Sequence, residues 1–314
     1  MVKCLHIKKR NEFMKKKIWM SLFLVLMMLL VLFLGIFLFT EEESEKTTAK
    51  KTKEPVTQVP AEEQELPPVA TLTEQEIQTV IDKELLPVKG TVHYGVRVYG
   101  DQPAELYTDS GPVPAASVIK LFVMEYAYSC ITAGTVTPET QIEGIALSRL
   151  IADMITVSDN EATNKLIRYF TMDAMNAYFK EQGYSDTALN RYMLDTEAMN
   201  NGKDNVSSVK DVMLFLDRLY QKRNQTPCSD MLEIMKRQTR ANKIRKNMPD
   251  GVAIANKTGE LPGKVENDVG IIFGGTVDFQ VVYLISDVQD NEDVQNKIAN
   301  TTLKLYELIE TKVK

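Results

Sequence analysis

The hydrophobic and polar positions divide the chain into three stretches of different character. Residues 18–39 are apolar and uncharged, and a run of 22 such residues is long enough to span a bilayer as a helix. Residues 40–72 are rich in Glu and Lys and contain four prolines and few large apolar residues, which predicts a disordered tether. In residues 73–314 the apolar positions recur with helical and strand periods, which predicts one folded domain.

Within this domain, the apolar spacing predicts strands near both ends and helices between them. Thr73 and Glu76 match a capping box at the start of a helix, and apolar and polar residues alternate over 91–98 as in a half-buried strand. Residues 117–220 have mostly helical spacing. Three strand-like runs and a last amphipathic helix then follow, the runs covering 252–257, 268–274 and 279–286.

This order of elements favours an α+β fold of three layers, αβα. One antiparallel sheet, built from both ends of the domain, would form the middle layer. The terminal helices would cover one face of the sheet, and the helical insert would cover the other. We therefore expect an active site at the seam between the sheet and the insert, where a concave pocket can form.

The distribution of charge predicts how the chain lies in a membrane. Residues 1–17 carry a net charge of +6, whereas residues 71–314 carry −8. A basic flank before an apolar span stays in the cytoplasm, and no cleavage site of small residues follows residue 39. We therefore predict a cytoplasmic flank at 1–17, a single-pass signal anchor at 18–39 in the cell membrane, and an extracytoplasmic domain. The acidic domain gives no reason to expect a nucleic-acid partner.

Histidine and cysteine are scarce, which excludes several kinds of site. With His6 and His93 as the two histidines, neither a Ser-His-Asp hydrolase nor a His-rich metal site is expected. Cys130 and Cys228 would lie outside the membrane, where they either pair or remain small buried thiols, the favoured interpretation. No Cys or His spacing indicates zinc, so we expect no metal and no cofactor, and we expect a monomer.

A serine and a lysine three residues apart offer another catalytic pair. Ser117 and Lys120 open a predicted helix, and this spacing places hydroxyl and amine on one helix face. Without a usable histidine, Lys120 is the available base for Ser117 if burial and a nearby cation lower its pKa. A second S-x-x-K match, from Ser207 to Lys210, precedes another helix and is interpreted as a helix cap.

Two tripeptides complete a family signature. Ser158-Asp159-Asn160 lies at a break between predicted helices, and Lys257-Thr258-Gly259 lies at the end of a predicted strand. Each alone is compatible with a helix cap or a turn. Together with S-x-x-K, in this order, they occur in class A β-lactamases and penicillin-binding proteins. The chain therefore resembles the penicillin-recognising serine hydrolases, and class A β-lactamases most, over residues 73–314.

The resemblance implies a role for each matched residue. Ser117 would be the acylated nucleophile, Lys120 its proton acceptor, and Ser158 the donor of a proton to the leaving nitrogen. Lys257 would also be the cation that lowers the pKa of Lys120. The remaining matched positions would bind substrate, with the backbone N–H of residue 260 in the oxyanion hole beside that of Ser117: Asn160, Lys257, Thr258, Gly259 and Glu260.

The chain departs from the family pattern in the omega loop, residues 184–206. In class A enzymes, a glutamate that activates the deacylating water lies two residues after the arginine that corresponds to Arg191. Here this position is Met193. Asp195 and Glu197 either take its place or are exposed loop carboxylates, as we favour. Arg191 and Asp204 are expected to pair across the neck of the loop.

A second departure concerns the substrate carboxylate. Residues 279–286 contain no arginine where many relatives have one. Lys264 either substitutes for it or is a solvated turn residue, which is the favoured interpretation.

Three functions are compatible with these patterns. The first is a membrane-anchored serine hydrolase of the class A β-lactamase type, which forms an acyl-enzyme on Ser117 with β-lactams and hydrolyses it slowly without the missing base. The second is a penicillin-binding-protein-like peptidase of the cell wall, acting on D-Ala-D-Ala ends. The third is a catalytically idle penicillin-binding or sensor domain, which the intact signature argues against.

Overall fold

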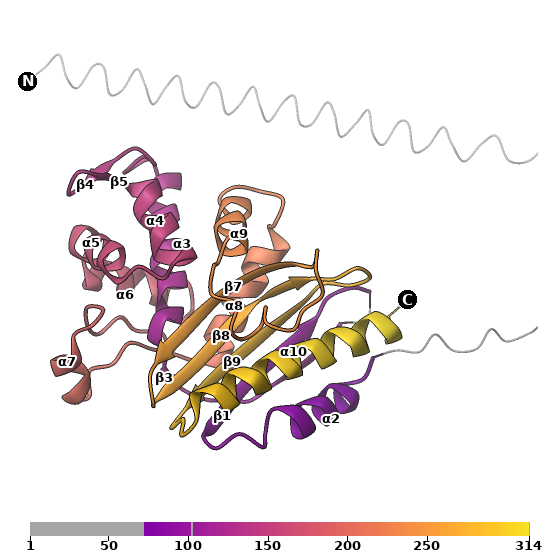
Figure 1. Cartoon of the computed structure of the whole chain (residues 1–314). Coiled ribbons are helices and arrows are strands. Elements are labelled where there is room, and N and C mark those ends of the chain that lie inside the picture. Colours follow the sequence, from indigo (N-terminus) through magenta and orange to yellow (C-terminus); the bar gives the residue numbers. More distant parts are fainter. Residues whose placement is uncertain (1–71, 102, 314) are drawn as a thin grey trace, which may run out of the picture. The chain divides into compact units, whose positions relative to one another are not determined.

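The computed structural model describes residues 72–101 and 103–313 (Figure 1). The predicted cytoplasmic flank, the anchor at 18–39 and nearly all of the tether lie outside the described residues. Among the residues that are described, no helix combines the length and apolar character needed to cross a membrane.

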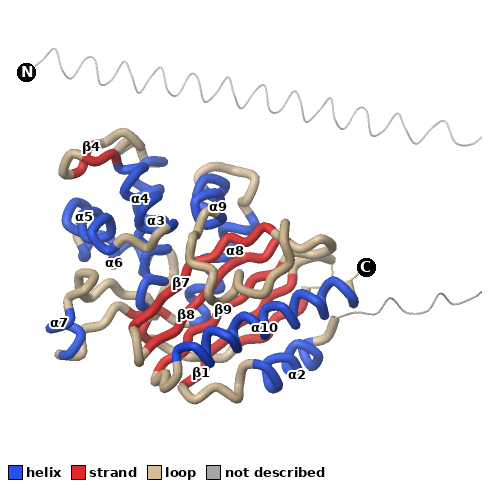
Figure 2. Tube along the Cα trace, viewed as in Figure 1, coloured by secondary structure: helices blue, strands red, loops and turns tan. Residues whose placement is uncertain are grey.

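A five-stranded antiparallel sheet forms the middle layer, in the order β2-β1-β9-β8-β7 (Figure 2). The last strand, β9, lies in the centre and pairs along the whole length of the first strand, β1, with Tyr94 opposite Tyr283. The strand bounds are β1 (Thr91–Val98), β2 (Ala104–Tyr107), β7 (Ala253–Leu261), β8 (Val265–Phe273) and β9 (Phe279–Ser286). The predicted antiparallel sheet from both termini is confirmed.

Two strand boundaries differ from the prediction. Strand β7 continues to Leu261 instead of ending at residue 257, and β8 begins at Val265 instead of residue 268. The hydrophobic pattern underestimates both because their added residues include buried polar side chains, such as Thr258 and Asn267. The short edge strand β2 was not predicted.

Two helices, α2 (Glu74–Glu84) and α10 (Asn291–Lys312), cover one face of the sheet (Figure 1). The predicted capping box is present, since the Glu76 N–H donates to Thr73 Oγ1 and the Thr73 N–H donates to Glu76 Oε2. Ile81 of α2, Ile298 of α10 and Tyr283 of β9 are buried in the core on this face.

The helical insert covers the other face and forms a second core. Its helices are α3 (Lys120–Thr132), α4 (Leu147–Thr156), α5 (Asn160–Phe170), α6 (Met172–Glu181), α7 (Thr196–Asn200), α8 (Val209–Gln221) and α9 (Cys228–Lys236). Three smaller elements complete the insert: the 3-10 turn η1 (Ala116–Ile119), the ladder β3 (Val113–Pro114) with β6 (Val206–Ser207), and the hairpin β4 (Gln141–Ile142) with β5 (Ile145–Ala146). The fold is therefore the predicted three-layer α+β arrangement.

Candidate active site

Ser117 lies in η1, the turn that leads into α3. The α-helix begins at Lys120 and not at Ser117 as predicted, because the chain first makes a 3-10 turn. Ala116, directly before the serine, has φ of 46°, a conformation that is strained for a residue with a side chain. Asn267 of β8 fixes this approach, since its Nδ2 donates to Pro114 O at 2.9 Å and to Ala115 O at 3.2 Å.

Lys120 is fully buried and its amine points to the break between α4 and α5. Its Nζ donates to Ser158 O and to Asn160 Oδ1, both at 2.8 Å, and lies 3.2 Å from Ser158 Oγ. Ser158 has φ of 61°, so its backbone turns back toward the lysine. The predicted S-D-N motif is thus also a helix start, where Asp159 caps α5 through the Ala162 N–H.

Lys257 approaches the same serine from β7. Its Nζ donates to Ser158 Oγ at 3.0 Å and to Thr258 O at 2.7 Å, and its side chain is fully buried. The sequence predicts the K-T-G motif at the end of a strand, but in the structure the motif lies within β7. Ser158 Oγ therefore lies between two amines, which leaves its own proton free to point into the cleft.

Both amines are easily deprotonated. Burial lowers the pKa of Lys120 to about 7, Asp159 opposes this shift, and Arg240 adds to it. Burial and the neighbouring Lys120 lower the pKa of Lys257 well below its usual range. Arg240, which no sequence motif indicates, is thus a further cation that lowers the pKa of Lys120. A neutral Lys120 near pH 7 can accept a proton.

Gly259 allows η1 to approach β7 closely. A Cβ at this position would lie 2.9 Å from Ala115 O and 3.2 Å from Ser117 N. The backbone amide of Ser117 therefore lies against β7 at Gly259, the residue directly before Glu260. This is the arrangement in which the Ser117 and Glu260 amides can serve one oxyanion.

These elements enclose a cleft of about 150 Å³ at the seam between sheet and insert. Five of the predicted site residues line it, and Lys120 and Lys257 are buried behind. The lining residues are Ser117, Ser158, Asn160, Arg240, Thr258, Glu260 and Pro262. The structure thus brings the three motifs together at one place.

Arg240 and the Glu260 side chain were missed because neither belongs to a motif. Arg240 lies in the segment between α9 and β7, and its guanidinium pairs with Glu260 at 3.3 Å. A signal was available, because residues 236–246 include six basic residues and no acidic one. Lys264 is exposed in the β7–β8 turn and does not line the cleft.

The omega loop has its expected neck but lacks a carboxylate toward the cleft. Arg191 and Asp204 pair at 2.8 Å, as predicted. Asn164 of α5 holds the backbone of Met193 on both sides, since its Oδ1 accepts from Met193 N at 2.8 Å and its Nδ2 donates to Met193 O at 3.2 Å. The side chain that this clamp fixes is a buried methionine.

Neither alternative carboxylate replaces the missing glutamate. Asp195 caps α7, since its Oδ1 accepts from the Ala198 N–H at 2.9 Å, and Glu197 is exposed in the first turn of that helix. Neither residue lines the cleft.

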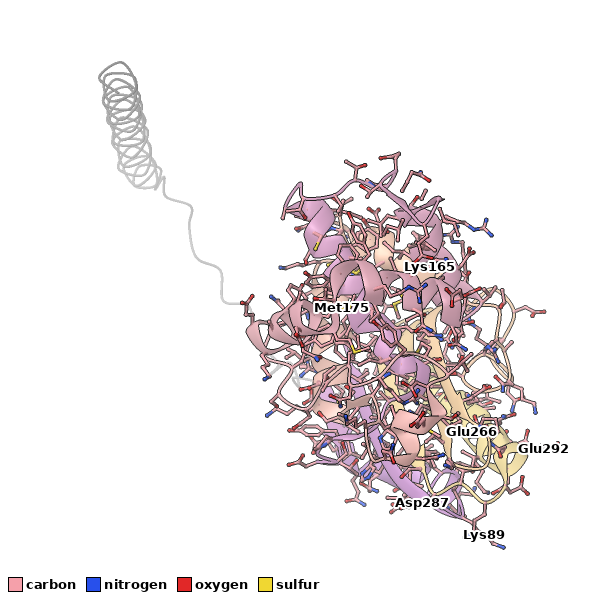
Figure 3. All side chains as sticks on the ribbon, turned by 90° about the vertical axis from the view of Figure 1, so that its left-hand side faces the viewer. Lys89, Lys165, Met175, Glu266, Asp287 and Glu292 are labelled. Atoms are coloured by element: carbon pink, nitrogen blue, oxygen red, sulfur yellow. The ribbon has the colours of Figure 1, made fainter. Side chains whose placement is uncertain are left out.

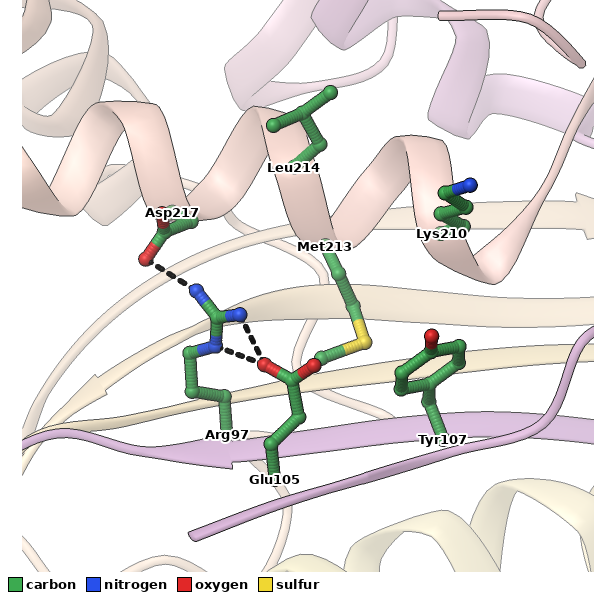
Figure 4. Close-up of a pocket in the computed structure, with 7 residues that line it drawn as sticks. All are labelled: Arg97, Glu105, Tyr107, Lys210, Met213, Leu214 and Asp217. Carbon is green, nitrogen blue, oxygen red and sulfur yellow. Dashed lines mark hydrogen bonds and ion pairs between the residues drawn. The ribbon is translucent and has the colours of Figure 1, made fainter. Parts of the chain in front are cut away.

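The second S-x-x-K match has a structural role, as predicted. Ser208 caps α8, and the buried Ser207 hydroxyl lies 2.8 Å from Thr187 Oγ1. Lys210 lines a separate hollow of about 230 Å³ between β1, β2 and α8, where Arg97 pairs with Glu105 and Asp217 (Figure 4). The hollow contains none of the predicted catalytic residues.

The two cysteines of the domain are free thiols. Cys228 is buried at the start of α9, whereas Cys130 is partly exposed on α3.

A nucleophile beside a buried lysine, a second serine between two amines, and a K-T-G strand define a serine hydrolase of the β-lactamase type. Residues 72–309 match the model of the β-lactamase enzyme family, and the chain belongs to this family.

Solved structures show the same fold. The chain is similar to PBP-A, with 21% identity and a TM-score of 0.67 over 76% of this chain and 98% of that one. It is also similar to a β-lactamase from Sphaerobacter thermophilus, with 22% identity and a TM-score of 0.64 over 76% and 97%. A leucine-to-glutamate variant of PBP-A, in an acyl-enzyme complex with penicillin G, gives 21% identity and a TM-score of 0.68 over 78% and 100%. No curated protein matches the sequence.

Proposed function

We propose that this serine hydrolase is acylated by β-lactams on Ser117 and releases the acyl group slowly. The observation that carries the proposal is the buried Lys120, whose amine lies 3.2 Å from Ser158 Oγ and whose pKa is about 7. The acyl-enzyme of the PBP-A variant with penicillin G supports the choice of compound class.

The proposed acylation needs only residues that line the cleft and the two lysines buried behind it. The neutral Lys120 amine takes the proton of Ser117, and Ser117 Oγ attacks the lactam carbonyl carbon. The oxyanion accepts hydrogen bonds from the Ser117 and Glu260 backbone amides. The C–N bond then breaks, and Ser158 gives its proton to the nitrogen. Lys120 and Lys257 lie close enough to Ser158 Oγ to replace that proton.

Slow release follows from the omega loop. Hydrolysis of the ester needs a base that activates water, and such a base contributes typically 10²–10⁴-fold. The Asn164 clamp holds Met193 where the family has its glutamate, and a thioether is no proton acceptor at neutral pH. We expect an acyl-enzyme that persists.

Intact mass spectrometry of the full-length protein with benzylpenicillin tests this proposal. We expect an adduct of the mass of penicillin that maps to Ser117 and decays slowly. Ser117→Ala should abolish labelling, whereas Ser207→Ala, in the second S-x-x-K match, should retain it. Labelling lost in Ser207→Ala and retained in Ser117→Ala would overturn the site assignment.

A cell-wall peptidase acting on D-Ala-D-Ala ends is the second candidate. Met193 favours this candidate, because a cell-wall peptidase needs only a transient acyl-enzyme with its peptide. Such an enzyme does not need the base that releases a trapped β-lactam. Incubation with a D-Ala-D-Ala peptide and measurement of released D-alanine distinguishes the two. Release that depends on Ser117 would establish the peptidase, and an adduct with penicillin without any release would favour the first candidate.

The sequence supports a place for this chemistry outside the cell. We propose that residues 18–39 anchor the chain in the cell membrane, with residues 1–17 in the cytoplasm and the catalytic domain outside. External protease applied to intact cells should digest the domain. A domain protected until the cells are lysed would contradict this topology.

A further inference from the structure

The cleft contains a carboxylate of its own at the end where K-T-G lies. Glu260 lines the cleft beside Thr258, and its side chain is 24% exposed. Its Oε1 accepts from Lys243 Nζ at 2.7 Å and from Asn242 Nδ2 at 3.2 Å, and its Oε2 lies 3.3 Å from Arg240 Nη1. Burial raises the pKa of Glu260, but Lys243, Asn242 and Arg240 together outweigh it and lower that pKa, which keeps the carboxylate ionised.

The cations at this end of the cleft are already paired. Lys243 is fully buried and bridges Glu260 to Glu266, whose Oε2 lies 2.6 Å from Lys243 Nζ. Glu266 is buried near the start of α10, where Asn291 also donates to it (Figure 3). Two carboxylates therefore match the two cations, Lys243 and Arg240, at this corner. Burial and the neighbouring amine also weaken the charge of Lys257.

A ligand carboxylate would meet a competitor here. To bind Arg240, it has to displace Glu260 from the guanidinium, and it then lies beside the Glu260 charge. Like charges a few ångströms apart repel, so the Glu260 carboxylate weakens the binding of a ligand carboxylate beside it. The corner is thus built to be satisfied without an anionic ligand.

We propose that Glu260 is a specificity-determining residue that selects against acyl donors with a carboxylate beside the scissile amide. This inference rests on the proposed acylation of Ser117. The favoured donors are those whose leaving group brings a neutral or positively charged end to Arg240 and Glu260. Penicillins carry a carboxylate on the ring next to the lactam nitrogen, so we expect them to acylate the wild-type protein, but more slowly than their neutral esters do.

Two compounds that differ in this carboxylate alone provide the test. The rates of Ser117 acylation by benzylpenicillin and by its methyl ester are measured on the full-length protein by mass spectrometry. The substitution Glu260→Gln keeps an oxygen acceptor for Lys243 and removes the charge. We expect the ratio of the acid rate to the ester rate to rise about tenfold, which corresponds to about 1.4 kcal/mol.

Two further variants separate this role from a structural one. Glu233→Gln removes a carboxylate that is 67% exposed on α9 and pairs with Lys236, and it should leave the ratio as in the wild type. In Glu260→Gln/Arg240→Gln the gain should disappear, because the freed guanidinium is what attracts the acid. Thermal unfolding of each variant shows whether it is folded.

The outcomes are distinct for the two proposals. A ratio that does not rise in Glu260→Gln, or a rise that survives Arg240→Gln, overturns the specificity role while Ser117 is still acylated. If neither compound labels Ser117 in any of the folded proteins, the proposed acylation fails and the specificity inference fails with it.

Discussion

The protonation of Lys120 decides when Ser117 can react. Acylation should be slow below pH 7 and should rise to a plateau above it, because the amine accepts a proton only when neutral and its pKa is about 7. The midpoint belongs to the coupled pair of Lys120 and Lys257. Stopped-flow acylation rates between pH 5 and 9 would measure it, and Lys120→Ala should lower the plateau by about 10²–10⁴-fold.

Arg240→Gln gives the same prediction a sign. Arg240 lowers the pKa of Lys120, so its removal should raise that pKa and move the midpoint to higher pH. Arg237→Gln, an exposed position that does not line the cleft, is the matched control. A midpoint that moves to lower pH in Arg240→Gln would contradict the proposed protonation.

Glu125 lies far from the cleft and makes the stability of the fold depend on pH. Burial raises its pKa to about 7, the Tyr184 hydroxyl and Arg218 oppose this, and its Oε2 has no hydrogen-bond partner within the described part of the chain. The native state therefore keeps this proton when the unfolded chain has lost it. The stability gained from this bound proton is fully present below pH 4.5. It is lost as the pH rises to about 7, which lowers the free energy of unfolding by about 3 kcal/mol.

Glu125→Gln should remove this pH dependence. We expect its free energy of unfolding to exceed that of the wild type at pH 8.5 by about 2–3 kcal/mol and to be similar at pH 4.5. Urea denaturation at both pH values measures the difference. Parallel stability curves for the two proteins would show that Glu125 keeps an ordinary pKa.

Single residues that position the site were the least predictable from sequence. Ser117, Lys120, Ser158 and Lys257 were found because their spacing has a chemical reason. Arg240 was not found, since it lies in a segment without regular spacing and meets the site only where it pairs with Glu260 of β7. The asparagines Asn164 and Asn267 were missed for a similar reason, because an amide that binds backbone atoms needs no neighbouring motif.

At the scale of elements, the omega loop is the place where one substitution should change the outcome of the reaction. Met193→Glu would place a carboxylate on the backbone segment that Asn164 holds, where we expect it to activate water. We expect the penicillin adduct to decay about 10²-fold faster or more, and Met193→Gln to have no such effect. Adduct lifetime by mass spectrometry is the measurement, and equal lifetimes in both variants would contradict the proposal.

The contact between η1 and β7 should tolerate no added side chain. In Gly259→Ala the Cβ would come within 2.9 Å of Ala115 O, so that η1 has to move away from the strand. We expect acylation to fall by about 10²-fold or more, because the Ser117 amide leaves the oxyanion position, with a loss of about 1–3 kcal/mol in stability. A folded variant with normal acylation would show that the backbone amides are placed differently.

The elements themselves were largely predictable. Helices with one apolar stripe, such as α10, and strands that alternate, such as β1, follow their periodicity. The hydrophobic pattern underestimates the lengths of β7 and β8 because both strands carry polar side chains into the interior. There Asn267 and Lys257 donate hydrogen bonds to other elements. Such partners exist only after the sheet and the insert have come together.

At the scale of the whole molecule, the sheet separates two hydrophobic cores, and the cleft borders only one of them. Ile298 lies in the core beneath α2 and α10 and is fully buried. Ile298→Ala should lower the free energy of unfolding by about 2–5 kcal/mol and leave the acylation rate of the folded protein unchanged. Lys304→Ala on the exposed side of the same helix should change stability by about 0.5 kcal/mol or less. A slower acylation in Ile298→Ala would show that the two cores are coupled.

The pairing of β1 with β9 also governs when the domain can form. During synthesis β1 emerges early, and until residues 279–286 have been made it has β2 alone to pair with. The central hydrogen-bond ladders therefore close last and over a long separation in sequence, which makes folding a late event. A chain whose synthesis stops before β9 should not fold into a weakened enzyme. It would instead be bound by chaperones or degraded by proteases.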